Sequence, residues 1–257
     1  MPVIEALILG IVQGITEFLP VSSTAHLILF PWFFNWGGEV DSLTFDVSLH
    51  AGTLLALLLC FRKDWIELIT KKQKLFALII LASIPAGVAG FFLNDAAEKY
   101  FRKPLLISIA LIAVGLLMLV AEKAFKYKDI EKTGLKDAII IGFAQAVAII
   151  PGVSRSGITI SAGLFRGFER EAAARFSFLL STPIIAGATV LHLKKAFLGP
   201  EVHNGQLFAV GLVASFVTGF IAIKFLLSFL KRHPLNLFAY YRFALSLVII
   251  AGIWLKG

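Results

Sequence analysis

The sequence predicts an all-α polytopic membrane protein with two inverted-topology repeats, each made of one re-entrant helical hairpin and three transmembrane helices. The first supporting observation is composition: 58% of the 257 residues are hydrophobic and 16% are charged, against roughly 45–50% and 25% in ordinary soluble domains. The second is a set of apolar runs of membrane-spanning length, and the third is an internal repeat. Together these features exclude an ordinary water-soluble enzyme.

Cysteine content and charge exclude two further classes of protein. Cys60 is the single cysteine, so an internally disulfide-bonded fold is excluded. The formal charge of +8 could indicate a nucleic-acid partner, but 24 phenylalanines and long charge-free runs leave no contiguous basic face for one. We therefore expect no nucleic acid, and we attribute the charge to basic loops of a membrane protein.

Six uninterrupted apolar runs approach the length of about 17–25 residues that crosses a bilayer. They are 45–61, 75–93, 104–121, 175–193, 207–230 and 235–255. We predict that each run forms one transmembrane helix.

Two other apolar stretches, 6–34 and 138–165, are interrupted in the middle. The interruptions contain Pro20 with residues 22–24, and Pro151 and Gly152 with residues 154–156. A non-helical backbone at membrane depth is tolerated only where it is buried in protein or lines a wet cavity. Both breaks are therefore candidate sites, and two merely kinked spans are the alternative.

Basic residues are unevenly distributed over the predicted loops. If each interrupted stretch is a hairpin, one side of the membrane carries 14 Lys and Arg, and the other carries 6. The loops of the basic side are 62–74, 122–137, 166–174 and 231–234. The positive-inside rule places these loops in the cytoplasm and both termini outside. Fully crossing stretches would give 13 against 7, so charge alone does not separate the two topologies.

Comparing the chain with itself at an offset of 132 residues indicates a duplication. The matching positions are Gly10, Gln13, Val21 and Ser22 with Gly142, Gln145, Val153 and Ser154, and Ala82, Ser83 and Gly87 with Ala214, Ser215 and Gly219. We predict a single integral membrane domain, 1–257, with repeat one at 1–130 and repeat two at 131–257. Three spans per repeat make the repeats inverted, and paired interrupted segments then indicate a site between them.

The first interruption carries an intramembrane carboxylate, Glu17, with Gln13 one helical turn before it. Such a carboxylate needs a partner, a metal ion or a proton to offset its desolvation, so it is a functional candidate. Ser22, Ser23 and Thr24 follow Pro20, and helix capping explains only one of these three hydroxyls.

His26 follows in the first turn of the next helix, where the helix dipole favours a neutral base. The alternative for His26 is a hydrogen-bonded structural histidine.

The second interruption has the composition of an anion site. Gly152 and Gly157 permit close backbone approach, and Arg155 offers a fork of donors suited to phosphate or carboxylate. The alternative is that Arg155 only neutralises Glu17.

Four other ionisable residues lie in apolar runs, and for each of them a structural role is the preferred interpretation. These are His50, Arg175, Lys224 and Arg242.

At both interruptions the sequence resembles the undecaprenyl-diphosphatase family, the bacterial bacitracin-resistance membrane phosphatases. The motifs are Gln13-x-x-x-Glu17 running on through Phe-Leu-Pro-Val-Ser-Ser-Thr-Ala-His26, and Pro151-Gly-Val-Ser-Arg-Ser-Gly-Ile-Thr159. The resemblance implies removal of the terminal phosphate from undecaprenyl diphosphate, which regenerates the carrier for cell-wall synthesis. It also implies a divalent cation, an inverted-repeat fold, and a site open to the outer, periplasmic face of the bacterial plasma (inner) membrane.

With this reaction, the motif residues support a hypothesis for the mechanism. Glu17 with Gln13 would bind Mg²⁺ or Ca²⁺. Ser23, or Ser22 in second place, would attack phosphorus with His26 or Glu17 as base, and direct attack by water is equally compatible. The expected phosphate-binding residues are Thr24, Ser154, Arg155, Ser156, Gly157 and Thr159. Some family members carry Glu at position 13, so Gln13 concentrates the charge on Glu17.

The expected partners are membrane lipid and an isoprenoid lipid diphosphate that enters sideways between spans, and a homodimer is left open. The competing function is a transporter or flippase of a lipid-linked phosphate, because inverted repeats with broken helices are also transporter architecture. A hydroxyl, an imidazole and a carboxylate around one site favour the enzyme.

Overall fold

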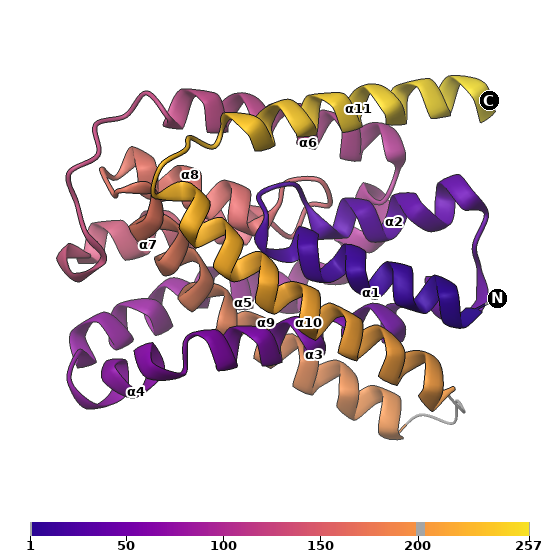
Figure 1. Cartoon of the computed structure of the whole chain (residues 1–257), viewed down its shortest axis with the longest axis horizontal. Coiled ribbons are helices and arrows are strands. Elements are labelled where there is room, and N and C mark those ends of the chain that lie inside the picture. The colour runs from indigo at the N-terminus through magenta and orange to yellow at the C-terminus, as the bar shows by residue number, and fades with distance from the viewer. Residues whose placement is uncertain (1, 199–203, 257) are drawn as a thin grey trace.

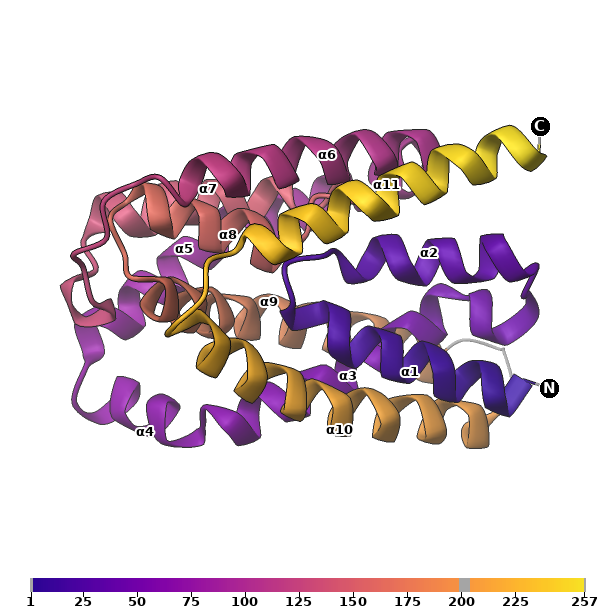
Figure 2. The same cartoon turned by 45° about the horizontal axis from the view of Figure 1, so that its top comes forward.

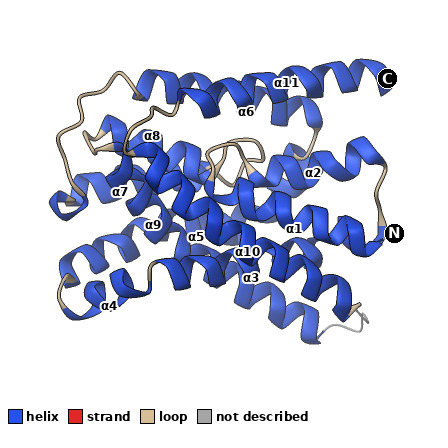
Figure 3. Ribbon diagram, viewed as in Figure 1, coloured by secondary structure: helices blue, strands red, loops and turns tan. Residues whose placement is uncertain are grey.

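The computed structural model describes residues 2–198 and 204–256, and these residues form a bundle of helices (Figures 1 and 3). In chain order the helices are α1 (Pro2–Phe18), α2 (Ser23–Phe34), the 3₁₀ turn η1 (Gly38–Asp41), α3 (Leu43–Cys60), α4 (Arg62–Thr70), α5 (Gln73–Phe101), α6 (Pro104–Ala121), η2 (Ile130–Lys132), α7 (Leu135–Val147), α8 (Arg155–Phe165), α9 (Arg170–Leu198), α10 (Gly205–Leu230) and α11 (Asn236–Lys256). The predicted all-α class is confirmed.

Five of the six predicted transmembrane helices are confirmed by length and composition. Among the described residues, α5, α6, α9, α10 and α11 contain segments long and apolar enough to cross a membrane. A sixth span is counted when α3 is taken together with α4, which follows it at a bend of 65°. The protein is therefore a multi-pass membrane protein. Large apolar side chains such as Phe91, Phe92 and Trp254 lie exposed on its outer surface, where lipid would surround them.

Both interrupted stretches are hairpins. In Figures 1 and 2 α1 runs from the N-terminus to the centre of the bundle, and α2 runs back beside it. Val40, beyond α2, packs with Ala6 and Leu9 of α1, so the chain returns to the end where it started. At the other end Lys128, before α7, pairs through its backbone with Gly167 and Glu169, which follow α8. These contacts exclude two kinked spans.

The helix breaks have one backbone conformation in common. Ser22 has φ 77° and Ser154 has φ 71°, a region that residues with a side chain seldom adopt. Each serine hydroxyl accepts a hydrogen bond from the backbone of the helix that follows, from Ala25 N for Ser22 and from Gly157 N for Ser154. Each cap satisfies a donor that would otherwise be unpaired at the start of a helix.

Glycines allow the hairpins to pack closely on spans of the other half of the chain. A Cβ on Gly10 of α1 would lie 2.6 Å from the Gly211 carbonyl oxygen of α10. A Cβ on Gly142 of α7 would lie 2.5 Å from the Ala82 carbonyl oxygen of α5. The Gly10 Cβ would also lie 2.8 Å from the Ala214 Cβ. The pairs Gly10 with Ala214 and Gly142 with Ala82 occupy equivalent positions at the 132-residue offset. The duplication and the inversion of the halves nevertheless stay predictions.

All four basic loops lie at one end of the bundle. Figure 1 shows the links α3–α4–α5, α6–α7, α8–α9 and α10–α11 at the end opposite both termini. The hairpin topology therefore gathers the loops that carry 14 Lys and Arg, as the sequence predicts for hairpins.

Candidate active site

The tips of the two hairpins meet at Glu17, near the end of α1. Its side chain is 3% exposed. Arg155 donates through Nη2 to Glu17 Oε1 at 2.6 Å, across 138 residues of sequence. On the other carboxylate oxygen, Oε2, Ser23 Oγ donates at 2.6 Å and Gln13 Nε2 at 3.0 Å. A buried carboxylate with three donors and one opposite charge is stabilised in its ionised form.

Of the three consecutive hydroxyls, each has a different environment. Ser22 caps α2, Ser23 donates to Glu17, and Thr24 is exposed and lines a cavity. The Ser23 hydroxyl therefore already has its proton directed at a carboxylate, as an activated nucleophile requires.

The hydrogen bonds of the His26 ring go to Ser22 and Tyr241, and not to Ser23. Its Nδ1 lies 2.7 Å from the Ser22 carbonyl oxygen, and its Nε2 lies 2.7 Å from the Tyr241 hydroxyl. Because a carbonyl only accepts, Nδ1 carries a proton, and in the neutral form of the ring Nε2 accepts from the Tyr241 hydroxyl. Both ring nitrogens are thus engaged. Of the two candidate bases, Glu17 and not His26 is in hydrogen-bond contact with Ser23.

Several predicted phosphate-binding groups of the second tip hold the fold together. Ser154 caps α8, and Ser156 Oγ donates to the Leu19 carbonyl of the first tip at 3.1 Å. The Gly157 N–H donates to Ser154, and Thr159 Oγ1 bonds to the Arg155 carbonyl and to Ser177. Of this group, only Ser154 and Arg155 line the hollow beside Glu17. The phosphate-binding roles stay predictions.

Arg242 of α11 joins the two tips. Its side chain is fully buried, and its Nη2 donates to the Gly152 carbonyl at 2.6 Å while Nη1 donates to Pro20 at 3.2 Å. Its Nε also donates to the Leu111 carbonyl. The side chain bridges helices, as its structural interpretation proposed, and it does so at the backbone of both hairpins.

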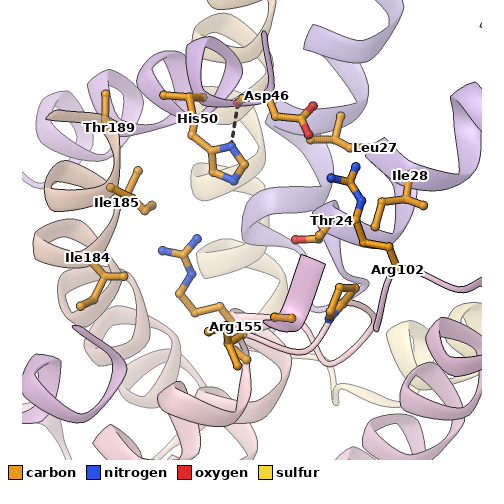
Figure 4. Close-up of a pocket in the computed structure, with 16 residues that line it drawn as sticks. Thr24, Leu27, Ile28, Asp46, His50, Arg102, Arg155, Ile184, Ile185 and Thr189 are labelled. Atoms are coloured by element: carbon orange, nitrogen blue, oxygen red, sulfur yellow. Dashed lines mark hydrogen bonds between the residues drawn. The ribbon is translucent and has the colours of Figure 1, made fainter. Parts of the chain in front are cut away.

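Two adjoining hollows lie at the tips. The inner one, about 40 Å³, is lined by Glu17, Ser22, Ser23, Thr24, Ala148, Ile150, Ser154 and Arg155. The outer one, about 250 Å³, shares Thr24, Ala148 and Arg155 with it. Figure 4 shows Arg155, His50, Asp46, Arg102 and Thr24 around the outer cavity, whose remaining wall is mostly apolar. The arrangement suits a ligand with an anionic head and an apolar tail.

Comparison with known proteins identifies the family of the chain. The model of the bacitracin resistance protein BacA family matches residues 6–248. The chain belongs to the BacA family. It is 56% identical over 245 residues, 95% of each chain, to a protein of Thermodesulfovibrio yellowstonii named undecaprenyl-diphosphatase. Proteins of the same name from Moorella thermoacetica and Desulforudis audaxviator are 48% and 47% identical, over 100% and 98% of each chain.

Sequence reasoning missed two residues at the site of this BacA family member. His50 of α3 lies with Nε2 3.7 Å from Glu17 Oε2, so it belongs to the surroundings of the carboxylate, whereas the sequence favoured a structural role. Arg102, which follows α5, lines the outer cavity. The only sequence signal for His50 was a polar residue in an apolar run. Arg102 belonged to a short loop that gave no signal.

Oxygen ligands for a divalent cation are present beside Glu17. The Gln13 Oε1 atom is buried and has no hydrogen-bond partner among the described residues, and carboxylate, amide and hydroxyl oxygens are the ligands that Mg²⁺ and Ca²⁺ prefer. Among the same residues, no group of three or more His, Cys, Asp or Glu is gathered for a metal. A cation at this site would thus depend on Glu17, Gln13 and oxygens of the substrate.

Proposed function

We propose that the protein is an undecaprenyl-diphosphatase, which hydrolyses undecaprenyl diphosphate to undecaprenyl phosphate and inorganic phosphate and so recycles the lipid carrier. Membership of the BacA family and the names of its relatives support this activity. The structural observation that carries it is the contact of Ser23 and Arg155 with the two oxygens of one buried carboxylate. Such a site offers a nucleophile, a base and an anion clamp together.

The geometry supports attack by Ser23 on the terminal phosphorus. A bond forms between Ser23 Oγ and phosphorus, the bond to the bridging oxygen breaks, and the lipid monophosphate leaves. Glu17 accepts the Ser23 proton across 2.6 Å and then gives it to the bridging oxygen of the departing lipid monophosphate. In the second step Glu17 takes a proton from the attacking water and returns it to Ser23 Oγ as the bond between Ser23 Oγ and phosphorus breaks, which releases inorganic phosphate.

Arg155 neutralises Glu17 before substrate binds and clamps phosphate afterwards. Its Nη2 bonds to Glu17, while its Nη1 is buried without a partner among the described residues. An incoming phosphate can therefore bind Nη1 and draw the guanidinium toward itself, which frees Glu17 to act as base. The neutralising role and the anion-binding role thus belong to successive states.

A divalent cation, Mg²⁺ or Ca²⁺, belongs to this proposal. Glu17 and the unpaired Gln13 Oε1 would hold it, and when bound it supplies positive charge that stabilises the phosphoryl group in the transition state.

We also infer that the site opens to the outer, periplasmic face of the bacterial inner membrane. The outer cavity is lined by residues of α2, of the first turns of α3 and of the link between α5 and α6. Figure 1 shows these segments on the side of the bundle that carries both termini, away from the basic loops. Because basic loops remain in the cytoplasm, this end faces outward.

A homodimer is a further proposal, and measuring the mass of the protein in detergent would test it.

The test of function measures phosphate release from undecaprenyl diphosphate, and from farnesyl diphosphate, by the purified protein in detergent. Chelator should abolish release and Mg²⁺ should restore it, and Glu17→Gln should lower kcat by about 10³-fold or more because the base is lost. Glu5→Gln, which alters a partly exposed carboxylate in the first turn of α1, is the matched control and should keep wild-type activity. Lipid binding without phosphate release would instead favour the flippase, and a flipping assay in liposomes would then decide.

A further inference from the structure

The inner hollow is the smaller of the two, about 40 Å³ against about 250 Å³ for the outer cavity. With the terminal phosphoryl group beside Ser23 in the inner hollow, the second, lipid-linked phosphate would lie in the outer cavity, which adjoins the inner one at Thr24 and Arg155. The outer cavity should therefore contain its own anion-binding group.

Arg102 is the arginine of the outer cavity that remains available for this role, because Arg155 also belongs to the inner hollow. Figure 4 shows the two guanidinium groups on either side of Thr24 in that view. The Asp46 carboxylate and the Arg102 guanidinium point toward each other there. Arginine has five N–H donors, so a guanidinium that faces Asp46 on one side still has donors for a phosphate on another.

The apolar wall of the outer cavity is suited to the isoprenoid chain that follows the second phosphate. Leu27 and Ile28 of α2 and Ile184, Ile185 and Ala188 of α9 line the same cavity. A diphosphate lipid lying here would place its terminal phosphate at Ser23, its second phosphate in the outer cavity and its first isoprene units against these side chains.

We propose that Arg102 binds the lipid-linked phosphate of the isoprenyl diphosphate and remains bound to the monophosphate product. The proposal rests on the phosphatase function argued above and adds a binding residue that neither hairpin motif contains. Arg102 thus sets the affinity for both substrate and lipid product, while the residues at the tips carry out the chemistry.

The first test compares Arg102→Ala and Arg102→Gln with Lys103→Ala. Lys103 is the next residue and an exposed cation outside the cavity lining, so its removal changes the net charge equally. With farnesyl diphosphate in detergent, both Arg102 variants should raise KM about tenfold or more, with kcat within about threefold, because hydrogen bonds to a charged group are lost. Lys103→Ala should stay within about twofold of wild type.

The second test uses two inhibitors to separate binding from damage to the fold. Farnesyl monophosphate carries the lipid-linked phosphate, whereas inorganic phosphate occupies only the terminal site. Arg102→Ala should weaken inhibition by farnesyl monophosphate about tenfold and leave inhibition by inorganic phosphate unchanged. Equal weakening of both inhibitors would overturn the proposal, because it would indicate general disruption of the site.

The two proposals fail in different ways. If wild type releases phosphate and the Arg102 variants keep the wild-type KM and inhibition by farnesyl monophosphate, the role of Arg102 is wrong and the phosphatase stands. If wild type releases no phosphate from either lipid, the phosphatase function is wrong and the assignment of Arg102 falls with it.

Discussion

The two hairpin tips share one backbone design and differ in their chemistry. Ser22 and Ser154 have nearly the same unusual φ and cap the helices that follow them. One residue further on, Ser23 stands on the first tip where Arg155 stands on the second. The strained serine is thus a requirement of the helix break, whereas the neighbouring residue is free to specialise.

The two tips also differ in that only the first carries a carboxylate, that of Glu17. Glu17 lies at the first tip, while Ile149 occupies the equivalent position 132 residues later. Gln13 donates to Glu17, but the buried amide of Gln145 has no hydrogen-bond partner among the described residues. One tip therefore carries the buried carboxylate and the other the positive charge that pairs with it. Residues with strained backbone often occur at functional sites, and here the strain is duplicated although the chemistry is not.

The largest effect should come from removing the hydroxyl that is specific to the first tip. Ser23→Ala should lower kcat by about 10³-fold or more, because the nucleophile is lost. Radiolabelled phosphate from the substrate should be trapped on wild type after acid quenching and not on the variant. Ser83→Ala removes another buried hydroxyl, on α5, and should keep activity within about twofold. A loss of only a few-fold in Ser23→Ala would replace the covalent step with direct attack by water.

The next effect tests the charge that is specific to the second tip. Arg155→Lys keeps the charge but loses the fork of donors, so kcat/KM should fall about 10- to 100-fold. The matched control is Arg166→Lys, since Arg166 pairs with Asp137 through Nε at the opposite end of the bundle. Unchanged turnover in Arg155→Lys would refute two-point recognition of the phosphate.

The third prediction tests a feature that the two hairpins share, a glycine at a close crossing with a neighbouring span, through its effect on stability. Gly10→Ala and Gly142→Ala each place a Cβ within 2.6 Å of a backbone oxygen of the neighbouring span. Both should destabilise the protein by about 1–3 kcal/mol, because neither backbone can move away without repacking. Gly90→Ala on α5 meets no atom within 4 Å and should be neutral or stabilising by up to about 1 kcal/mol. Thermal unfolding in detergent measures all three, and a wild-type midpoint for either tight glycine would contradict the close crossing.

The smallest effect concerns Glu122, far from both tips. Burial raises the pKa of its carboxyl group, but the Arg170 side chain, the Leu235 N–H and the charge of Lys126 lower it by more, so the pKa lies below its ordinary value of 4.5. A lowered pKa in the folded state contributes stability above pH 4.5 that is lost as the pH falls further.

Acidification from pH 5 to pH 3 should therefore lower the unfolding midpoint of wild type by about 2–4 °C more than that of Glu122→Gln. Thermal unfolding of both proteins in detergent across this range measures the difference. Parallel curves for the two proteins would show that the Arg170–Glu122 contact does not stabilise the fold.

Local properties of the sequence determined the helices and the breaks between them. Hydropathy determined the spans because the length of an apolar helix must match the bilayer. Pro20 and the serines at positions 22 and 154 marked the two breaks, and the offset of 132 residues connected them. The two motifs also contained Glu17 and Arg155, whose contact the structure shows.

Only the tertiary structure decided which side chains meet. His50 lies 33 residues from Glu17 in the chain, and Arg242 lies 222 residues from Pro20, yet both reach the tips. It also directed the Ser23 proton to Glu17 and paired His26 with Tyr241. Contacts between distant segments depend on how helices cross and on how buried polar groups find partners, and neither is encoded in the spacing of residues along one helix.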